Sequence, residues 1–459
     1  MPDKNKVAVV GGGISGLSCA WRLQKLGIPV TLFESEDHSG GLIGTVEQDG
    51  FLFESGPQSF QATETLLDLI RELGIEGELC EANPRAPRFV LRHGKMQKVP
   101  MSPQGIITSS LLSAGSRWKV VSEPLHRTRP PSEEESVAAF VRRKFGHEIL
   151  EYLVSPFVSG VYAGDPEKLS LRAAFPTLEE WEREYGSVIR GAMKSRPKPT
   201  NGERKRKHPS LCSFKRGVNT LSRSIAEQLG ANLQVRTRTC TIGRSAGDLQ
   251  IHAERNGQAE THSARAVVLA TPAYVASHLL GPLSAPLAQT LSGIAYAGVA
   301  VIAAGYYAKQ VGVSLDGFGF LVPRSENMRT LGTVWNSSLF PGRAHEGNVA
   351  ITSFAGGATD TDILTKPDQE IASLVQAENA KILQIEGAPV ASAIWKHPKA
   401  LPQYNLGHGH IISAIQEFEK QNAGLFFSGN YLEGPSLGKC VEHGFKTADA
   451  VRDFLAGAK

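Results

Sequence analysis

The chain has 459 residues, of which 41% are hydrophobic and 20% are charged, and its formal net charge at pH 7 is +4. These proportions are typical of a folded globular protein and exclude an intrinsically disordered chain. The length leaves room for two or three domains. A positive charge this small does not indicate a nucleic-acid partner, and it suits weak attraction to an anionic lipid surface or an anionic substrate.

The sequence shows no signal for export, membrane crossing or metal binding. The residues before Val7 lead directly into an apolar strand pattern, so we expect no signal or transit peptide. There is no run of about 20 apolar residues, so we expect no membrane-spanning helix. The five cysteines are scattered without a C-x-x-C pair, which predicts reduced thiols and no zinc site. His408 and His410 resemble a metal-binding pair but lack further ligands, so we predict no metal.

A strand–helix–strand unit opens the chain. Residues 7–10 form a short apolar run, and residues 14–26 have helical spacing and end at Gly27. Residues 30–33 form a second apolar run, which is followed at once by Glu34. This order predicts two parallel strands joined by a helix.

The turn between the first strand and the helix satisfies the pattern G-x-G-x-x-G, from Gly11 to Gly16. Its glycines let the backbone approach a pyrophosphate, which the N-terminus of the following helix then faces with free N–H groups. Glu34 stands about 20 residues further on, where a carboxylate accepts hydrogen bonds from ribose hydroxyls. Strand, turn, helix and acid together predict a dinucleotide site rather than a glycine turn that serves packing alone.

Glycine-rich turns at both ends of the chain favour FAD over NAD. Gly40-Gly41 follows the acid, and Gly56-Pro57 follows the apolar run of residues 51–53. Near the C-terminus, residues 434–437 precede a helix whose positive end could stabilise the negative charge of a reduced flavin. The residues that we predict to contact FAD are Gly11, Gly13, Ile14, Ser15, Gly16, Glu34, Gly40, Gly41, Leu42, Gly56, Pro57, Gln58, Ser59, Thr239, Gly429, Pro435, Ser436 and Leu437.

Further elements follow in chain order. We predict a helical stripe over residues 137–158, an exposed polar loop over 194–207, a helix over 214–229, β hairpins over 235–269, strands over 294–307 and 349–354, a helix over 371–385, a strand over 425–427, and a closing helix that runs to Leu455. The fold class is α/β with mixed α+β character: an FAD-binding Rossmann-like domain, an interleaved substrate domain and a helical, membrane-associated insertion. We place the FAD-binding domain at residues 1–85, 212–285 and 400–459, the substrate-binding domain at 86–102 and 286–399, and the insertion at 103–211.

The stretch from Gly160 to Pro166 contains two glycines, an aromatic residue and a proline within seven positions, so we predict an irregular backbone there. It belongs to an ordered series: residues 11–16, 53–57, 88–89, 111–113, 155–176, 213–217, 317–323, 331–333, 340–341, 401–408 and 429–430. This series resembles the oxygen-dependent protoporphyrinogen oxidases over nearly the whole chain, with gaps around residues 194–207.

The resemblance implies a tetrapyrrole that lies beside the flavin. Arg88 matches the arginine that binds a propionate. A guanidinium suits that role because it holds a carboxylate through two parallel hydrogen bonds. Leu321, Val334 and Phe354 match aliphatic and aromatic contacts to the rings, and Gly160 matches backbone that approaches the macrocycle from the other side. Without the resemblance, Arg88 would be read as an exposed strand arginine and the three apolar residues as core.

Two positions depart from the family pattern. Members of the family often carry Trp before Pro where this chain has His397-Pro398, and Trp395 lies two residues upstream. The chain therefore departs from the family pattern at the aromatic wall near the flavin. Val334 is smaller than the leucine common at its position, which would widen the pocket slightly.

The implied function is the six-electron oxidation of protoporphyrinogen IX to protoporphyrin IX, with O2 as acceptor and H2O2 as product, in haem and chlorophyll biosynthesis. FAD carries the chemistry of such an oxidase of CH–CH groups, and accordingly we find no catalytic dyad. The alternatives are oxidation of coproporphyrinogen III to coproporphyrin III, a flavin amine oxidase, and a flavin-binding protein without redox turnover.

Residues 106–125 mix apolar side chains with Arg117 and Lys119, a composition that fits either an interfacial membrane segment or a packed helical insertion. The basic run of residues 204–207 fits a solvated loop or a contact with anionic lipid. From the family we expect a cytoplasmic protein that is peripheral to the inner face of the cell membrane. A homodimer and transfer of the product to a ferrochelatase are further expectations.

Overall fold

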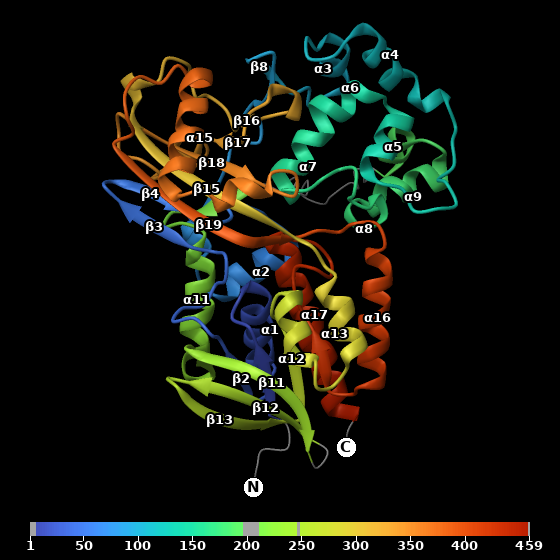
Figure 1. Cartoon of the computed structure of the whole chain (residues 1–459), viewed down its shortest axis with the longest axis vertical. Coiled ribbons are helices and arrows are strands. Elements are labelled where there is room, and N and C mark those ends of the chain that lie inside the picture. Colours follow the sequence, from blue (N-terminus) through green and yellow to red (C-terminus); the bar gives the residue numbers. More distant parts are fainter. Residues whose placement is uncertain (1–5, 196–210, 246–247, 458–459) are drawn as a thin grey trace, which may run out of the picture.

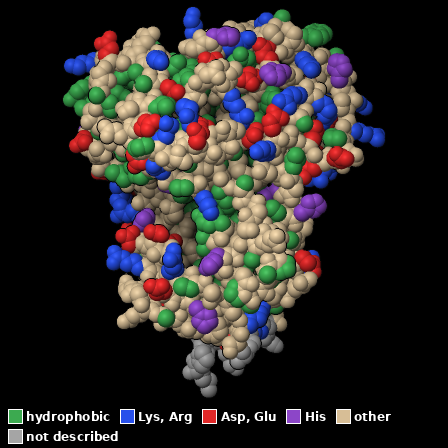
Figure 2. Space-filling model, viewed as in Figure 1, with side chains coloured by type: hydrophobic (Ala, Val, Ile, Leu, Met, Phe, Trp, Pro, Cys, Tyr) green, Lys and Arg blue, Asp and Glu red, His purple; other side chains and the backbone are tan. Residues whose placement is uncertain are grey.

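The computed structural model describes residues 6–195, 211–245 and 248–457, which form three lobes (Figure 1). The lower lobe contains both the first strand and the last helix, a sheet lobe lies above it on one side, and a helical lobe lies above it on the other. The predicted loop at residues 194–207 falls almost wholly outside the described residues. On the visible face, hydrophobic side chains gather at the waist between the lower and upper lobes (Figure 2).

The lower lobe is built on a parallel sheet of five strands. In order of hydrogen bonding they are β10 (Leu233–Gln234), β2 (Val30–Phe33), β1 (Val7–Val10), β14 (Ala266–Leu269) and β20 (Leu425–Phe427). β1 and β14 are apolar at every position because helices cover both faces of the sheet. Val7 and Val9 pack on α1 (Ile14–Lys25), α11 (Asn219–Leu229) and α17 (Leu437–Gly457), whereas Ala8 and Val10 pack on α12 (Ala273–Leu280) and α13 (Ala285–Ser292). The predicted opening strand–helix–strand unit and the predicted C-terminal strand and helix are confirmed.

Smaller elements surround this sheet. They are β5 (Phe60–Gln61) with β6 (Leu79–Glu81) and β9 (Leu211–Phe214), the meander β11 (Thr237–Ser245), β12 (Asp248–Arg255) and β13 (Gln258–Ala264), and the helices α2 (Glu64–Glu72) and α16 (His408–Gln421). The hairpin of β3 (Thr45–Gln48) and β4 (Phe51–Glu54) lies higher, where Phe51 and Phe53 pack against the sheet lobe (Figure 1). The hairpins predicted over residues 235–269 are confirmed. The helix predicted from Phe214 is wrong for its first turn: Phe214 ends a strand, and Gly217, at φ +88°, separates it from α11.

The sheet lobe contains seven strands. In order they are β19 (Ala391–Pro402), β15 (Tyr296–Tyr307), β18 (Asn348–Gly356), β17 (Thr330–Val334), β16 (Gly319–Leu321), β7 (Arg88–Arg92) and β8 (Lys95–Lys98). α15 (Asp368–Leu383) covers one face, where Asn379 hydrogen-bonds to Thr333 and Ser353 at 2.9 and 2.8 Å. The strands predicted at 294–307 and 349–354 and the helix predicted at 371–385 are confirmed. The opposite face is turned toward the helical lobe.

The helical lobe contains α3 (Pro103–Thr108), α4 (Ala114–Ser122), η2 (Glu123–Leu125), α5 (Val137–Lys144), α6 (His147–Ile149), η3 (Leu150–Val154), α7 (Ser155–Tyr162), α8 (Leu171–Ala174), α9 (Pro176–Tyr185) and α10 (Val188–Lys194). The single helical stripe predicted over residues 137–158 is interrupted, because Gly146 adopts φ +92° and ends the first helix. The irregular backbone predicted from Gly160 begins later than expected. Gly160 and Tyr162 are still helical, and the helix ends at Ala163, which has a left-handed conformation at φ +47°.

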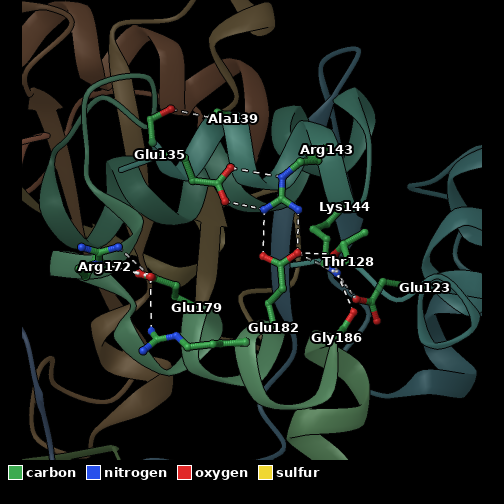
Figure 3. A network of polar contacts seen from close by, with 12 residues as sticks. Glu123, Thr128, Glu135, Ala139, Arg143, Lys144, Arg172, Glu179, Glu182 and Gly186 are labelled. Atoms are coloured by element: carbon green, nitrogen blue, oxygen red, sulfur yellow. Dashed lines mark hydrogen bonds and ion pairs between the residues drawn. The ribbon is translucent and has the colours of Figure 1, made fainter. Parts of the chain in front are cut away.

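A buried network of charges ties these helices together (Figure 3). Lys144, which is only 6% exposed, lies 3.0 Å from Glu123 and 3.3 Å from Glu182. Arg143 donates to both oxygens of Glu182, at 2.7 and 2.9 Å, and also pairs with Glu135. Burial raises the pKa of Glu182, but hydrogen bonds from Arg143 and Thr128 outweigh burial and hold that pKa below its usual value. The network fixes the helical lobe through contacts that no local sequence pattern reveals.

None of the helices in the described part of the chain is long and apolar enough to cross a bilayer.

Candidate functional site

The glycine turn after β1 has the shape that a dinucleotide requires. Gly11 adopts φ +106°, which side chains rarely tolerate, and a Cβ built on Gly16 would overlap the carbonyl oxygen of Gly11. A Cβ built on Gly13, in contrast, has no neighbour within 4 Å. Gly13 therefore borders open space at the N-terminus of α1, where a phosphate can approach the free N–H groups of Ile14 and Ser15.

Glu34 holds this turn in place. Its Oε2 accepts a hydrogen bond from the Gly12 N–H at 2.7 Å, and its Oε1 accepts from the Glu36 N–H at 2.8 Å and from the Ser35 hydroxyl at 3.1 Å. A carboxylate offers about four acceptor sites, so one remains for a ribose hydroxyl. The carboxylate thus both orders the glycine turn and keeps capacity for the ligand predicted from the sequence.

Two further predicted turns lie against the first. Gly40 pairs with Gly13 as in a parallel sheet, and the Gly40 N–H donates to the Gly12 carbonyl at 2.8 Å. A Cβ on Gly41 would lie 3.4 Å from the Cα of Gly13, and a Cβ on Gly56 would overlap the carbonyl oxygen of Leu42. The structure therefore brings residues 11–16, 40–42 and 56 together at one edge of the parallel sheet.

Three buried polar atoms near this edge have no hydrogen-bond partner within the described residues: Gln234 Oε1, Thr239 Oγ1 and Thr271 Oγ1. Buried polar groups are normally satisfied, so unpartnered ones indicate a missing ligand or water. Thr239 was predicted from the sequence, whereas Gln234 and Thr271 were missed. Both lie at the carboxyl end of a parallel strand or just beyond it, where ligands of such sheets bind, and that position was the signal that could have found them.

The C-terminal turn reaches the same edge. A Cβ on Gly429 would lie 3.6 Å from the carbonyl oxygen of Thr271, and a Cβ on Gly11 would lie 3.1 Å from the Thr271 side chain. Pro435 and Ser436 directly precede α17, which begins at Leu437. The orphaned atoms, the open space at Gly13 and the convergence of these turns fit an extended dinucleotide cofactor.

The predicted substrate residues share one face of the seven-stranded sheet. Arg88, Gly319, Val334 and Thr352 lie opposite one another in a row across β7, β16, β17 and β18. The next row contains Val90, Leu321, Gly332 and Phe354. Paired residues point to the same side, and so do residues two apart along a strand, so Arg88, Leu321, Val334 and Phe354 all face away from α15.

Gly160 approaches this face from α7. A Cβ on Gly160 would lie 2.7 Å from Cδ2 of Leu321, and a Cβ on Gly332 would lie 2.9 Å from the same atom. The Leu321 side chain therefore occupies space that two glycines leave free, one on the helix and one on the sheet. Phe157 and Val161, one turn apart on α7 and 46% and 45% exposed, flank the helical glycine. The sequence analysis missed both, although apolar residues at i and i+4 around a glycine were a usable signal.

Trp395 and His397, at the first departure from the family pattern, both lie on β19. We call the face that carries Arg88, Leu321, Val334 and Phe354 the substrate face. Trp395 pairs with Val301, which pairs with Phe354, so Trp395 lies on the substrate face and packs in the same apolar cluster as Phe354. His397 is also on this face, and its Nε2 lies 2.7 Å from the carbonyl oxygen of Ser55. An aromatic side chain is thus present on the face, two residues before the histidine.

Titratable groups around the two regions do not form an acid–base pair. Arg88 is exposed, and its guanidinium lies 5.2 Å from the centre of the Phe318 ring. His408 is buried with Nε2 2.9 Å from the carbonyl oxygen of Tyr431, and burial lowers the pKa of its imidazole. No cluster of three metal-ligating side chains occurs among the residues that the structure covers. The glycine turns and the face that carries Arg88 can together bind a dinucleotide and orient a flat, partly anionic ligand beside it.

Residues 14–452 match the family model described as "Flavin containing amine oxidoreductase". Over 472 aligned residues the chain is 37% identical to protoporphyrinogen oxidase 1 of Spinacia oleracea, an alignment that covers 98% of this chain and 84% of the relative. The chain belongs to the protoporphyrinogen oxidase branch of the flavin-containing amine oxidoreductases. It is therefore a flavoprotein oxidoreductase whose cofactor is FAD.

Other similar proteins are more distant in sequence. The coproporphyrinogen III oxidase of Bacillus subtilis is 27% identical over 459 residues, covering 96% of each chain. Among solved structures, a protein from Exiguobacterium sp. 255-15, provisionally named a protoporphyrinogen oxidase, superposes with a TM-score of 0.83 at 23% identity, covering 98% of this chain and 99% of that one. A reduced UDP-galactopyranose mutase superposes with a TM-score of 0.74 at 16% identity, covering 98% and 96%. At these identities the solved structures show the shared fold alone.

Proposed function

We propose that the protein oxidises protoporphyrinogen IX to protoporphyrin IX, with O2 as the electron acceptor and H2O2 as the product. The observation that carries the proposal is the common face of the sheet on which Arg88, Leu321, Val334 and Phe354 lie, opposite Gly160 of α7. The names of the relatives at 35–37% identity support it. Bound FAD supplies hydride acceptance and reaction with O2, and the chain supplies binding and orientation.

The substrate face suits a large flat ring system. Gly319 has no side chain, so it lowers the surface between Arg88 and Val334, whereas the Leu321 side chain covers Gly332 in the next row. Apolar side chains then contact the rings, while the Arg88 guanidinium at one end binds a carboxylate. Phe157 and Val161 provide apolar surface on α7 for the other side of the macrocycle.

The charges on this face favour protoporphyrinogen over coproporphyrinogen. Protoporphyrinogen carries two propionates, and coproporphyrinogen carries four. Arg92 also lies on the face, but it pairs with Glu148 at 3.0 Å and donates to the Leu111 carbonyl. Arg88 has no acidic partner among the described residues. One available guanidinium suits a substrate whose propionates are grouped at one edge, and a second pair of carboxylates would stay unpaired against apolar surface.

Turnover of both porphyrinogens by the purified holoenzyme, followed by porphyrin fluorescence, tests the proposal. We expect a higher kcat/KM for protoporphyrinogen IX, and a higher value for coproporphyrinogen III would transfer the assignment to the alternative substrate. Oxidation of neither porphyrinogen, with H2O2 released from polyamines, would identify an amine oxidase instead. A folded flavoprotein that is not bleached by either porphyrinogen under anaerobic conditions would be a binding protein.

We also propose that the helical lobe contacts the inner face of the cell membrane, which places the protein in the cytoplasm. Within the predicted interfacial segment, Leu111, Leu112 and Val120 are buried and support the lobe itself. Trp118 and Leu125 are 70% and 75% exposed. Exposed apolar side chains next to lysine and arginine are typical of proteins that insert into the headgroup region.

Flotation with vesicles of anionic phospholipid tests this contact. The double variant Trp118→Ser, Leu125→Ser should leave the vesicle fraction, whereas the control Met193→Ser, at a residue that is 66% exposed on α10, should behave like the wild type. Equal flotation of all three proteins would place the membrane contact elsewhere. A homodimer and transfer of the product to a ferrochelatase stay predictions.

A further inference from the structure

The segment Ser55–Ser59, part of the predicted FAD site, is held from the sheet lobe at two points. His397 of β19 places Nε2 2.7 Å from the carbonyl oxygen of Ser55. Asn336, the first residue of α14 (Asn336–Leu339), places Nδ2 2.7 Å from Oε1 of Gln58. We call these two side chains the clamp. Asn336 lies 278 residues beyond Gln58 in the chain, and His397 lies 342 residues beyond Ser55.

Donors and acceptors in the clamp are fixed by chemistry. The Ser55 carbonyl can only accept, so the proton of the imidazole is on Nε2 of His397. Gln58 donates through Nε2 to the carbonyl oxygens of Gly56 at 2.8 Å and Glu54 at 3.2 Å, so its Oε1 is the acceptor for Asn336. Gln58 and Asn336 are 7% and 3% exposed, so loss of this hydrogen bond would not be compensated freely by water.

The clamped segment lies directly against the cofactor turns. A Cβ on Gly56 would overlap the carbonyl of Leu42, and Gly41 of the same turn is close to the backbone of Gly13. A separate buried ion pair, between Arg343 and Glu54 at 3.1 Å, fixes the strand that leads into the segment. Glu54 is therefore fixed just before the segment, and the clamp contacts the segment itself at Ser55 and Gln58.

We propose that His397 and Asn336 are positioning residues that hold Ser55–Ser59 against the flavin, so that the lobe that carries the substrate face also completes the cofactor site. The proposal rests on the proposed function, because it takes the flavin to lie beside this segment. This role suits a histidine at position 397, because its Nε2–H is the donor to the Ser55 carbonyl. A tryptophan carries its single N–H on a larger ring. Neither residue is assigned a role in proton transfer.

Titration of the apoprotein with FAD tests the clamp. His397→Phe and Asn336→Leu each remove one neutral hydrogen bond, so the dissociation constant of FAD should rise by about 2- to 10-fold in each variant. The visible absorption bands of the bound flavin should shift in both. In the double variant the rise should be smaller than the product of the two single rises, because both residues hold one segment.

Two further variants, one conservative and one remote, distinguish a positioning role from a general loss of stability. His397→Gln keeps an N–H that can reach the Ser55 carbonyl, and it should restore the affinity and the spectrum. His410→Phe alters an exposed histidine on α16 and should match the wild type. Melting of each apoprotein is measured in parallel, and if His397→Phe or Asn336→Leu melts far below the wild type, His397→Ala and Asn336→Ser replace them.

Unchanged FAD affinity and an unchanged flavin spectrum in the folded variants would overturn the clamp. So would an equal loss in His397→Gln and His397→Phe. These outcomes differ from failure of the proposed function, in which the wild-type protein itself would bind no FAD or would oxidise no porphyrinogen.

Discussion

Substitution of Gly160 by alanine tests the contact between α7 and the substrate face. The new Cβ would lie 2.7 Å from Cδ2 of Leu321, well inside the usual contact distance of about 3.5–4.0 Å between carbons. Leu321 has little room to retreat toward the sheet, because its Cδ2 already fills the position of a side chain on Gly332, only 2.9 Å from a Cβ built there. The leucine must therefore move toward the open side of the helix, which is the space proposed for the macrocycle.

The size of the effect follows from the strain. Overpacking of this kind costs about 1–3 kcal/mol, and substrate that pushes Leu321 back would have to supply that energy. KM should then rise by about 5- to 150-fold while kcat changes less. The stability of the fold should change little, since alanine favours a helix over glycine by up to about 1 kcal/mol and offsets part of the strain.

A double-mutant cycle with Leu321→Ala provides the decisive comparison. Shortening the leucine removes the atom that the new methyl group on α7 would contact, so Gly160→Ala should raise KM far less in the Leu321→Ala background than in the wild type. The assay is porphyrin fluorescence over a range of protoporphyrinogen concentrations, and thermal unfolding serves as the control for folding. Effects that add to within about 0.5 kcal/mol would show that the two residues do not interact, and the reasoning would fail.

Three further predictions concern the cofactor, the substrate charge and the helical lobe. Gly13→Val should give a folded but colourless protein, because its side chain enters open space at the pyrophosphate, whereas Gly16→Val should lower the melting temperature of the apoprotein; the reverse pattern would contradict the cofactor placement. Arg88→Ala should raise KM by about 10- to 150-fold through loss of about 1.5–3 kcal/mol, and unchanged kinetics would remove the arginine from the site. Glu182→Gln should destabilise the protein by about 3–5 kcal/mol in urea unfolding, because Lys144 and Arg143 lose a buried partner. The folded-state pKa of this glutamate is lowered, so its stabilisation is present above about pH 4.5 and is lost as the pH falls through the folded pKa; the variant should show a weaker loss of stability in acid.

The sequence alone was sufficient where structure depends on local pattern. The run of residues 7–34 specifies strand, glycine turn, helix, strand and acid, since each step follows from apolar spacing or from glycine conformation. The C-terminal strand and helix were predicted for the same reason. The substrate residues came from the family resemblance, because a single arginine or leucine in a strand gives no local sign of its role.

Some differences between prediction and structure also have local causes. Gly146 and Gly217 adopt positive φ and interrupt helices that apolar periodicity had predicted to be continuous. Periodicity records which positions are buried, and it is insensitive to one residue that leaves the helical conformation. For Gly160 the difference was the opposite one. The composition around this glycine predicted an irregular backbone, but Gly160 is helical, and it has no side chain where α7 packs against Leu321.

What the sequence determined by itself is the chemistry of the two ends, a dinucleotide turn that opens the chain and a glycine turn with a helix that closes it. Tertiary structure decided which distant residues meet. The sheet register aligns Arg88 with Val334 across Gly319, and His397 reaches Ser55 from 342 residues away. Such meetings depend on the pairing of strands far apart in the chain, which local pattern does not encode. The buried network of Lys144, Glu123 and Glu182 was equally hidden, because a charged residue appears solvent-exposed until the partners that neutralise it are known.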